Sequence, residues 1–266
     1  MSDNHICGRA RIQMTCRSIL PRLAFAGILL SAIPVAAQPS AREIMKRADE
    51  LTRGETAQGT YTMTVVRPDW KRTMVFAYWS EGTEKSFIRV EEPVKDRGVS
   101  FLKVGREMWQ YVPRINRVIK IPPSMMLQSW MGSDFTNDDL VKESSVVDDY
   151  EHTLLAQEEL DGFDTYKIEL VPKPETAVAW DKLIEWIRVD DYVPLRAEYY
   201  SERGELVRTM LFGDIKKMSD RVIPARYELI EEKKEGRRTI LQLDDVVFDK
   251  TIPGSVFTQR NLRKSR

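Results

Sequence analysis

Cysteine and histidine, which often bind zinc or act in catalysis, are nearly absent after the first 37 residues. Both cysteines, Cys7 and Cys16, lie before that point, and His152 is the only histidine after it. Zinc sites built from several cysteines or histidines, and Cys-His catalytic pairs, are therefore excluded there. A Ser-His-Asp triad would have to use His152, which lies in a stretch that alternates between polar and apolar residues. We interpret it more simply as an exposed strand residue.

Acidic residues gather at two places, in residues 134–139 and at 148–149. Calcium needs six or more oxygen ligands, and the spacing does not match an EF-hand loop. The first cluster is explained more simply if Thr136 caps a short helix and Asp138 and Asp139 complement its dipole. No pair of carboxylates stands out for glycoside hydrolysis. We therefore expect no metal, no cofactor and no enzymatic activity.

The N-terminal segment has the pattern of a secretory signal peptide. Arginines up to Arg22 precede an apolar stretch from Leu23 to Val35, and the small residues Ala36 and Ala37 follow. This stretch is shorter than the roughly 20 residues of a membrane-spanning helix. We predict cleavage after Ala37 and a periplasmic protein. A lipid anchor is not expected, because no cysteine directly follows the apolar stretch.

The remaining residues, 38–266, are expected to form a single domain. Their number, 229, is one that a β-rich domain commonly reaches. Four arginines and one aspartate precede residue 38, so 37 basic and 40 acidic residues remain and the formal charge is −3. This balance lacks the basic footprint of a nucleic-acid-binding protein, and we expect a monomer that binds no nucleic acid.

The elements that would position a site are predicted to be one helix followed by many strands. Ser40 and Glu43 form a capping box, and Gly54 is suited to end the helix. Beyond it, apolar residues recur at every second position in short runs, which indicates strands. The predicted strands are 61–65, 73–78, 86–91, 98–104, 107–112, 116–121, 146–157, 163–171, 181–189, 194–201, 206–212, 222–231 and 238–248.

The connections between these strands are short. Turns such as Asp161-Gly162 and Glu235-Gly236 favour antiparallel hairpins over helical crossovers. A consecutively wound sheet of this size is expected to curl, because the twist between strands accumulates. We predict an α+β, mostly β fold: a large curved antiparallel sheet forming an unclosed barrel, with an N-terminal helix and a helical or loop segment as lid or plug.

One stretch, residues 122–140, interrupts the strand pattern. Three methionines and Trp130 cluster there before Gly132, and a short helix is predicted from Thr136. The stretch is too long and too apolar for an ordinary hairpin loop. It could fill one end of the sheet as core, or cover the concave face as a lid, for which flexible methionine side chains are suited. Both interpretations remain open.

Several short motifs follow one another between residues 87 and 140. The run Phe87-Ile88-Arg89-Val90-Glu91-Glu92-Pro93 is followed by a strand at 99–103, a turn at Gly105 and the run Trp109-Gln110-Tyr111. This order resembles that of the LolA/LolB-like outer-membrane lipoprotein-sorting proteins. Residues 132–140 resemble a signature of a longer, largely uncharacterised branch of that family. The resemblance spans essentially all of residues 38–266.

The resemblance implies an unclosed antiparallel sheet wrapped around helices, with an apolar cavity that holds acyl chains. It implies a periplasmic carrier of lipoproteins or other lipids, acting in outer-membrane lipoprotein sorting or lipid transport, with an inner-membrane transporter and an outer-membrane acceptor as partners. In the family, an arginine on the sheet helps to hold the lid closed, and Arg89 is the matching position. This chain departs from the pattern in its greater length and in lacking the family's helical lid pattern after the first hairpins.

The candidate ligand-binding residues are aromatic and apolar side chains on one face of the predicted strands, together with the interrupted stretch and Arg89. Each of the apolar ones could instead fill the core. They are Tyr61, Met63, Val65, Met74, Phe76, Tyr78, Phe87, Arg89, Phe101, Trp109, Tyr111, Met125, Met126, Trp130 and Met131.

Two other functions remain open. A non-enzymatic interaction module of an envelope transporter system would add a partner's strand to the open edge of the sheet. A hydrolase on this scaffold would need a polar cleft with carboxylates of perturbed pKa. The last six residues, 261–266, are basic, and we interpret them as a frayed tail or a weak attraction for anionic head groups.

Overall fold

The computed structural model describes residues 38–141, 145–174 and 180–264, and the side chains of residues 140 and 141 are not included in that description. The predicted signal peptide, with both cysteines, lies outside these residues. The helices are α1 (Ala41–Arg53), α2 (Asn137–Val141) and α3 (Gln259–Leu262), with short 3-10 helices at Pro113–Ile115, Pro123–Met125 and Gly254–Phe257. The strands are β1 (Thr56–Val66), β2 (Lys71–Glu81), β3 (Lys85–Glu92), β4 (Ser100–Val104), β5 (Glu107–Val112), β6 (Arg117–Ile121), β7 (Tyr150–Leu160), β8 (Phe163–Pro172), β9 (Lys182–Arg188), β10 (Pro194–Tyr200), β11 (Leu206–Met218), β12 (Arg221–Glu231) and β13 (Arg238–Phe248).

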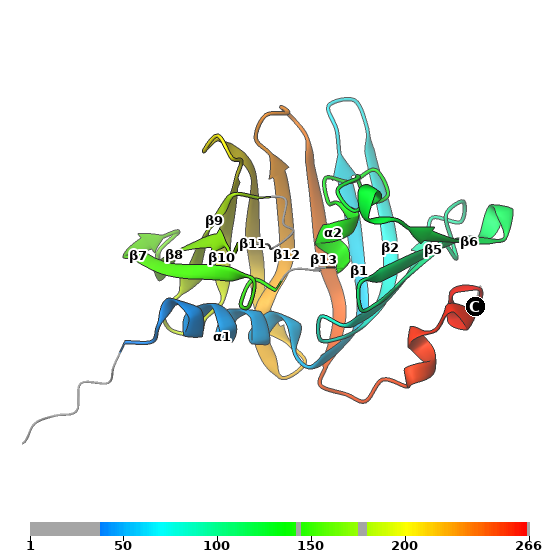
Figure 1. Ribbon diagram of the computed structural model, residues 1–266, viewed down its shortest axis with the longest axis horizontal. Coiled ribbons are helices and arrows are strands. Elements are labelled where there is room, and N and C mark those ends of the chain that lie inside the picture. Colours follow the sequence, from blue (N-terminus) through cyan, green and yellow to red (C-terminus); the bar gives the residue numbers. More distant parts are fainter. Residues whose placement is uncertain (1–37, 142–144, 175–179, 265–266) are drawn as a thin grey trace, which may run out of the picture. The chain divides into compact units, whose positions relative to one another are not determined.

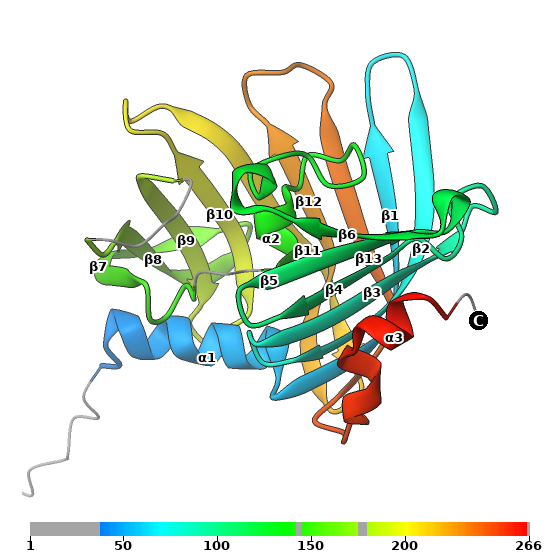
Figure 2. The same cartoon turned by 45° about the vertical axis from the view of Figure 1, so that its right-hand side comes forward.

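All of these strands form one antiparallel sheet, in the order β6-β5-β4-β3-β2-β1-β13-β12-β11-β10-β9-β8-β7. The predicted strands and the mostly β, unclosed architecture are confirmed. Within each half of the sheet, neighbouring strands are consecutive in the sequence. The first strand, β1, lies in the middle of the sheet and pairs with the last strand, β13, with Ala57 opposite Phe248. The first half ends at the edge strand β6 and the second begins at the opposite edge strand, β7. The sheet curves so that its two ends come forward around α2 (Figures 1 and 2).

Three predicted strands need the largest boundary corrections. Strand β1 begins at Thr56 and not at residue 61, since Thr56 to Thr60 are already paired with β2. Strand β7 begins at Tyr150 and not at residue 146, because the preceding residues form a turn in which the amide of Asp149 donates to the carbonyl of Ser145. Strand β11 continues to Met218, past the predicted end at residue 212, because Ile215 to Met218 stay paired with β12. The turn glycines behave as expected, and Gly162 has a φ of 83°.

Helix α1 begins and ends as predicted. The hydroxyl of Ser40 accepts a hydrogen bond from the amide of Glu43 at 3.2 Å, and the amide of Gly54 donates to the carbonyl of Glu50 at 3.0 Å. One face of the helix is buried against the concave side of β7, β8 and β9. This second core cluster contains Ala41, Ile44, Met45, Ala48, Tyr150, Tyr166, Ile168, Leu170, Leu183 and Ile187. Helix α1 therefore covers the concave face of the second half of the sheet.

The C-terminal segment packs on the opposite, outer face of the first half. Leu262 is 1% exposed, and its carbonyl accepts a hydrogen bond from the hydroxyl of Ser100 at 2.9 Å. Ile252 and Phe257 join it in an outer cluster with Phe87 and other residues of β3 to β5. Figure 2 shows this segment lying along those strands. The interpretation of the C-terminal end as a frayed tail is therefore wrong for Leu262, which packs on an apolar outer surface of the sheet, whereas Arg263 and Lys264 are exposed.

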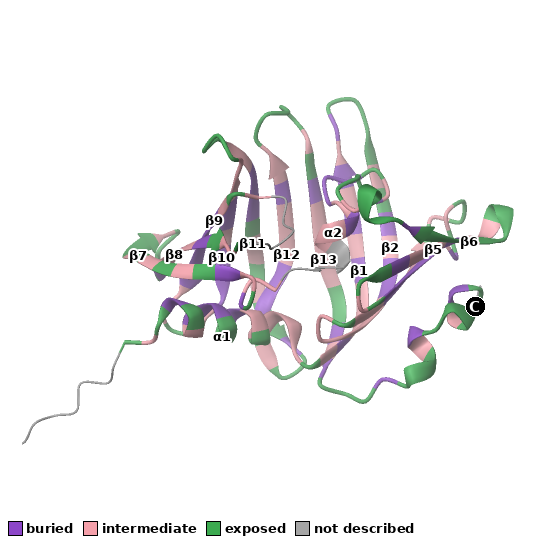
Figure 3. Ribbon diagram, in the orientation of Figure 1, coloured by how far each residue is buried: buried purple, intermediate pink, exposed green. Residues whose placement is uncertain are grey.

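The two edge strands each have a strand neighbour on one side only within the part of the chain that is described. Along β7, side chains alternate between half-buried and exposed after the buried Tyr150 (Figure 3).

No helix among the described residues has the length and apolar composition needed to span a membrane.

Candidate functional site

The interrupted stretch links β6 at one edge of the sheet to β7 at the other, so it crosses the concave face. Its central residue, Trp130, is 1% exposed, and its ring centroid lies 5.0 Å from that of Phe76 and 5.3 Å from that of Phe101. Phe135, from the same stretch, is buried beside it in the first core cluster. Of the two open interpretations, core filling therefore holds for this part of the stretch.

We call residues 122–140 the covering segment. Two arginines, at the adjoining ends of β1 and β2, fasten it to the sheet. The guanidinium of Arg67 donates to the carboxylate of Asp134 at 2.9 Å and to the carbonyl of Gly132 at 3.1 Å, while Arg72 donates to the carbonyl of Met131. Asp134 also accepts from the hydroxyl of Thr239 on β13 at 2.7 Å. The side chains of Arg67 and Asp134 are 8% and 1% exposed. This anchor is a buried network of hydrogen bonds.

A third arginine holds the helical end of the covering segment. Arg208 of β11 makes two hydrogen bonds to the carboxylate of Asp139, at 3.0 and 2.6 Å, and lies 4.3 Å from the ring centroid of Trp180 and 4.6 Å from that of Tyr199. Arg208 is almost fully buried. Burial acts to raise the pKa of Asp139, but the charge and hydrogen bonds of Arg208, aided by Thr136, outweigh it and lower that pKa.

Asp139 also lies in the first turn of helix α2, which Thr136 caps as the sequence predicted. The amide of Asp139 donates to the hydroxyl of Thr136 at 3.1 Å, and the carboxylate of Asp139 accepts from the amide of Thr136 at 2.7 Å. The side chain of Asn137 donates to the carbonyl of Met125 at 2.9 Å. The hydroxyl of Ser133 donates to the carbonyl of Trp130 at 2.7 Å. The family-like signature at 132–140 thus consists largely of residues that shape and anchor the covering segment.

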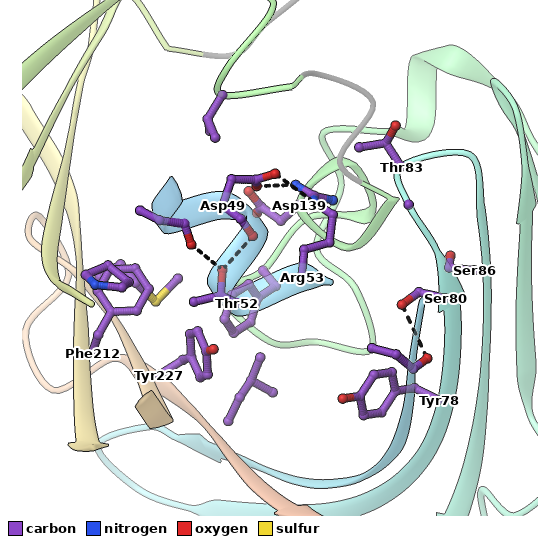
Figure 4. A pocket seen from close by; sticks show the side chains of 18 of the residues that line it. Asp49, Thr52, Arg53, Tyr78, Ser80, Thr83, Ser86, Asp139, Phe212 and Tyr227 are labelled. Atoms are coloured by element: carbon purple, nitrogen blue, oxygen red, sulfur yellow. Dashed lines mark hydrogen bonds and ion pairs between the residues drawn. The ribbon is translucent and has the colours of Figure 1, made fainter. Parts of the chain in front are cut away.

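A cavity of about 410 Å³ lies between helix α1, the covering segment and the concave face of the sheet. Such a volume is within the usual range of small-ligand sites, roughly 300–1,000 Å³. Figure 4 shows Phe212 and Tyr227 on one side of it, Tyr78 on the other, and Asp49, Thr52 and Arg53 of α1 above. The apolar and aromatic lining consists of Met45, Ala48, Ala57, Tyr61, Tyr78, Trp79, Ile88, Phe135, Val146, Tyr150, Trp180, Leu183, Pro194, Tyr199, Met210, Phe212, Tyr227, Leu241, Leu243 and Phe248.

The polar groups on the cavity wall include charged residues, small hydroxyl side chains such as those of Thr52 and Ser80, and tyrosines. Some of the charged residues form ion pairs, such as Asp49 with Arg53 at 2.6 Å on helix α1. Burial raises the pKa of the tyrosines Tyr78, Tyr199 and Tyr227 well above the ordinary value of 10.0. Their hydroxyls therefore stay protonated and neutral in any physiological medium. The wall can bind apolar matter and offer neutral hydrogen bonds.

The structure divides the predicted site residues into three groups. Tyr61 and Tyr78 line the cavity. A larger group fills the first core cluster or packs against it: Met63, Val65, Met74, Phe76, Phe101, Met126, Trp130 and Met131. Phe87, Trp109 and Tyr111 belong to the outer cluster beneath the C-terminal segment, and Met125 is 36% exposed.

Arg89 is also placed on the outer face of the sheet. Its neighbours Ile88 and Val90 belong to the inner core cluster, so alternation turns Arg89 the other way. There its guanidinium pairs with Glu91 at 2.7 Å and lies 5.6 Å from the ring centroid of Trp79. The lid-holding position implied for Arg89 by the resemblance therefore needs correction, since Arg67, Arg72 and Arg208 contact the covering segment.

Sequence reasoning missed Arg208 and the cavity residues of the second half of the sheet. A signal was present, because Arg208 alternates with Met210 and Phe212 on an otherwise apolar strand face. A charge at an inward position needs a buried partner. The identity of that partner, Asp139, could not be read from the sequence.

His152 is half-buried and not exposed as predicted, because its Nε2 lies 2.7 Å from the carbonyl of Val146 in the turn before β7. Burial is the main cause that lowers its pKa. Within the described ranges, no three histidine, cysteine or acidic side chains group closely enough to hold a metal ion. The hydrolase alternative predicts a polar cleft with carboxylates of perturbed pKa; Asp139 on the cavity wall has a lowered pKa, and its carboxylate is paired with Arg208.

Three solved structures share this fold. A LolA superfamily protein from Nitrosomonas europaea is 24% identical, with a TM-score of 0.72 over 84% of this chain and 100% of that one. A DUF1329 family protein from Desulfovibrio piger is 24% identical, with a TM-score of 0.76 over 84% and 97%. A putative outer membrane lipoprotein-sorting protein domain from Vibrio parahaemolyticus is 22% identical, with a TM-score of 0.74 over 84% and 98%.

The curated proteins contain no match to this chain. A family model described as "-like: Uncharacterized protein" matches residues 82–264, which is more than half of the chain. That range takes in most of the sheet, the covering segment and the C-terminal segment. The chain therefore belongs to the family of this model, and its fold is the one seen in the LolA superfamily and lipoprotein-sorting structures.

Proposed function

We propose that this protein is a periplasmic carrier that holds the acyl chains of lipoproteins or other lipids in the cavity beneath helices α1 and α2. The observation that supports this most directly is a cavity of about 410 Å³ with a largely apolar and aromatic wall, beneath a segment fastened by specific ion pairs. Binding of this kind needs no catalytic group. Each methylene removed from water contributes about 0.8 kcal/mol, so several of them suffice for useful affinity.

The two anchors of the covering segment suggest which end opens to admit a ligand. Asp134 is 1% exposed and is held by both Arg67 and Thr239, whereas the side chain of Asp139 is 20% exposed and lines the cavity. We propose that the α2 end moves, with Arg208 and Asp139 separating, while the Asp134 anchor remains in place. Exchange of ligand would then leave the first core cluster intact.

The route of the protein is also part of the proposal. Residues 1–37 would direct export and be removed, and residues 38–266 would act as a single domain, with an inner-membrane transporter and an outer-membrane acceptor as partners. Mass analysis of the protein recovered from periplasm tests this, since cleavage after Ala37 predicts a chain that begins at Gln38. A mass that includes the first 37 residues would contradict it.

The function itself is tested by native mass spectrometry with lipid extraction, on protein purified from periplasm without detergent. We expect a monomer with bound acyl species at close to one per chain. Leu243→Trp serves as a matched control, because the larger side chain occupies the cavity and should remove the bound species. A clean unliganded mass that persists after incubation with phospholipid and lipopeptide would contradict the proposal.

A second candidate function rests on the two sheet edges. Strands β6 and β7 each have one free side among the residues that the structure covers, and an extended segment of a partner could pair there. The protein would then be a non-enzymatic interaction module of an envelope transporter system. This candidate is favoured if the protein stays unliganded but a partner peptide protects the amides of β6 or β7 from hydrogen exchange.

A further inference from the structure

We propose that the cavity selects ligands that carry a neutral hydrogen-bond acceptor, such as an ester or amide carbonyl, on an aliphatic body, and that the hydroxyl of Tyr61 donates to this acceptor. The inference rests on the proposed carrier function and specifies the chemistry of its ligand. A cavity of this kind would discriminate against a plain hydrocarbon and against a charged end group.

The hydroxyl of Tyr61 is a buried polar group without a hydrogen-bond partner among the described residues. The residue is 7% exposed, and its ring stacks on that of Phe76, with centroids 4.9 Å apart. Buried hydroxyls in folded proteins are nearly always hydrogen-bonded, and one left unsatisfied costs about 1–3 kcal/mol. A ligand atom that accepts from Tyr61 removes this cost, which a methylene group cannot do.

Tyr61 lies on the wall of the cavity among further tyrosines. It is on β1, opposite Leu243 of β13, and its ring centroid is 5.7 Å from that of Tyr78 on β2. Figure 4 shows Tyr78 and Tyr227 on opposite sides of the cavity floor, with their hydroxyls directed inward. Leu241 and Leu243 line the wall with them. Hydroxyl donors thus stand in an otherwise apolar surface, which suits a chain with one embedded polar group.

The surroundings favour a neutral acceptor over an anionic one. Burial raises the pKa of Tyr61, Tyr78 and Tyr227, which means that this region disfavours negative charge. The cations on the cavity wall already have partners. Arg53 is paired with Asp49 and Lys85 with Glu81, and the ammonium group of Lys103 donates to the carbonyl of Thr83. A carboxylate placed beside Tyr61 would lose its hydration without gaining a counter-charge, whereas a carbonyl would lose little.

The test is a competition assay with three small probes of similar length. The full sequence is expressed, and the purified protein is stripped of lipid and loaded with the apolar fluorophore N-phenyl-1-naphthylamine. Methyl octanoate, decane and octanoate are then compared as competitors. The variant is Tyr61→Phe, and Tyr111→Phe is the matched control, because the hydroxyl of Tyr111 bonds to Asn116 at 3.1 Å away from the cavity.

We expect the unmodified protein to bind methyl octanoate more tightly than decane or octanoate. Tyr61→Phe should weaken methyl octanoate roughly two- to tenfold, the value of one hydrogen bond, and leave decane unchanged. Tyr111→Phe should change neither. An equal effect on methyl octanoate and decane, or none on either, would overturn the role of Tyr61 while leaving the carrier function intact. Failure of the unmodified protein to bind any of the probes would overturn both.

Discussion

The concave face of the sheet has a filled region and a hollow region, and the same strands run through both. In β1, Met63 and Val65 are completely buried in the first core cluster, whereas Tyr61 lines the cavity. In β2, Phe76 is completely buried, whereas Tyr78 borders empty space. Inward positions on both sides of this boundary carry bulky apolar or aromatic side chains, so the size of these side chains does not explain the difference.

The difference lies in what covers the two regions. Over the filled region, the covering segment inserts the indole ring of Trp130, which contacts Phe76 and Phe101. Over the hollow region, helix α1 presents Met45, Ala48, Asp49, Thr52 and Arg53, none of which is aromatic. Because protein interiors are normally packed without large voids, a cavity of about 410 Å³ sets this region apart from ordinary core. The comparison shows that the cover decides between core and cavity.

The largest expected effect comes from making the filled region hollow. Trp130→Ala removes a fully buried indole ring, and we expect the free energy of unfolding to fall by about 3–5 kcal/mol, measured by urea titration. Trp70→Ala is the control, since Trp70 is 48% exposed, and it should cost less than about 1 kcal/mol. A loss as small for Trp130 as for Trp70 would mean that the two regions do not differ in packing.

Breaking the anchor at the boundary of the hollow region should have the next largest effect. Asp139→Ala leaves the buried guanidinium of Arg208 without its carboxylate, and we expect a loss of about 3 kcal/mol in the free energy of unfolding. Asp148→Ala is the control, because it removes an ion pair with Arg42 in which both side chains are more than half exposed. Its loss in the free energy of unfolding should stay below about 1 kcal/mol. Equal losses would show that the Arg208 pair is no anchor.

The same anchor predicts a dependence on pH. The pKa of Asp139 is lowered below its ordinary value of 3.8, so its stabilising effect is complete above that value and is lost as the pH falls through the lower folded-state pKa. Release of N-phenyl-1-naphthylamine should therefore accelerate only in this acidic range. Asp139→Ala should release the fluorophore quickly at neutral pH and lack this acid dependence. An unchanged profile in the variant would assign the acid effect to another group.

A matched pair of enlargements sharpens the comparison further. Leu229 is completely buried in the filled region, and Leu243 lines the cavity. Leu229→Trp should overpack the core and cost about 1–3 kcal/mol, whereas Leu243→Trp should change the free energy of unfolding by less than about 1 kcal/mol and lower the affinity for N-phenyl-1-naphthylamine. Equal destabilisation without a change in affinity would mean that the space beside Leu243 is not a binding site.

The smallest effect is expected on the outer face. Arg89 pairs there with Glu91 and lies over Trp79, so Arg89→Leu should leave the release rate of the fluorophore unchanged and alter the free energy of unfolding by less than about 1 kcal/mol. Arg208→Met, measured in parallel, should accelerate release. Faster release in Arg89→Leu than in Arg208→Met would restore the lid-holding role that the family resemblance implied.

Much of the fold could be predicted because it depends on local chemistry. The cap at Ser40, the turn glycines and the alternation along each strand were sufficient to place α1 and all the strands. The candidate site was predicted less well. Tyr61 and Tyr78 share the pattern of Phe76, and nothing in their sequence context indicates that only the first two border a cavity.

Two of the candidate ligand-binding residues were wrongly placed on the concave face for a specific reason. Phe87 and Tyr111 have the apolar, alternating pattern of an inward face, yet they pack outward because the C-terminal segment covers that side of the sheet. A strand buried on both faces carries no sequence signal that tells one face from the other. The C-terminal cover is more than 140 residues away along the chain, as the bond from Ser100 to Leu262 shows.

The sequence by itself therefore determined the types of element, most of their boundaries and the open, mostly β architecture, because hydrogen bonding and side-chain alternation act over a few residues. Only the tertiary structure decided that β1 lies beside β13, that Arg208 meets Asp139, and that the space beneath helix α1 stays empty. These features depend on volumes and charges contributed by segments far apart in the chain. Whether an apolar side chain becomes core or cavity wall is fixed only when its cover is in place.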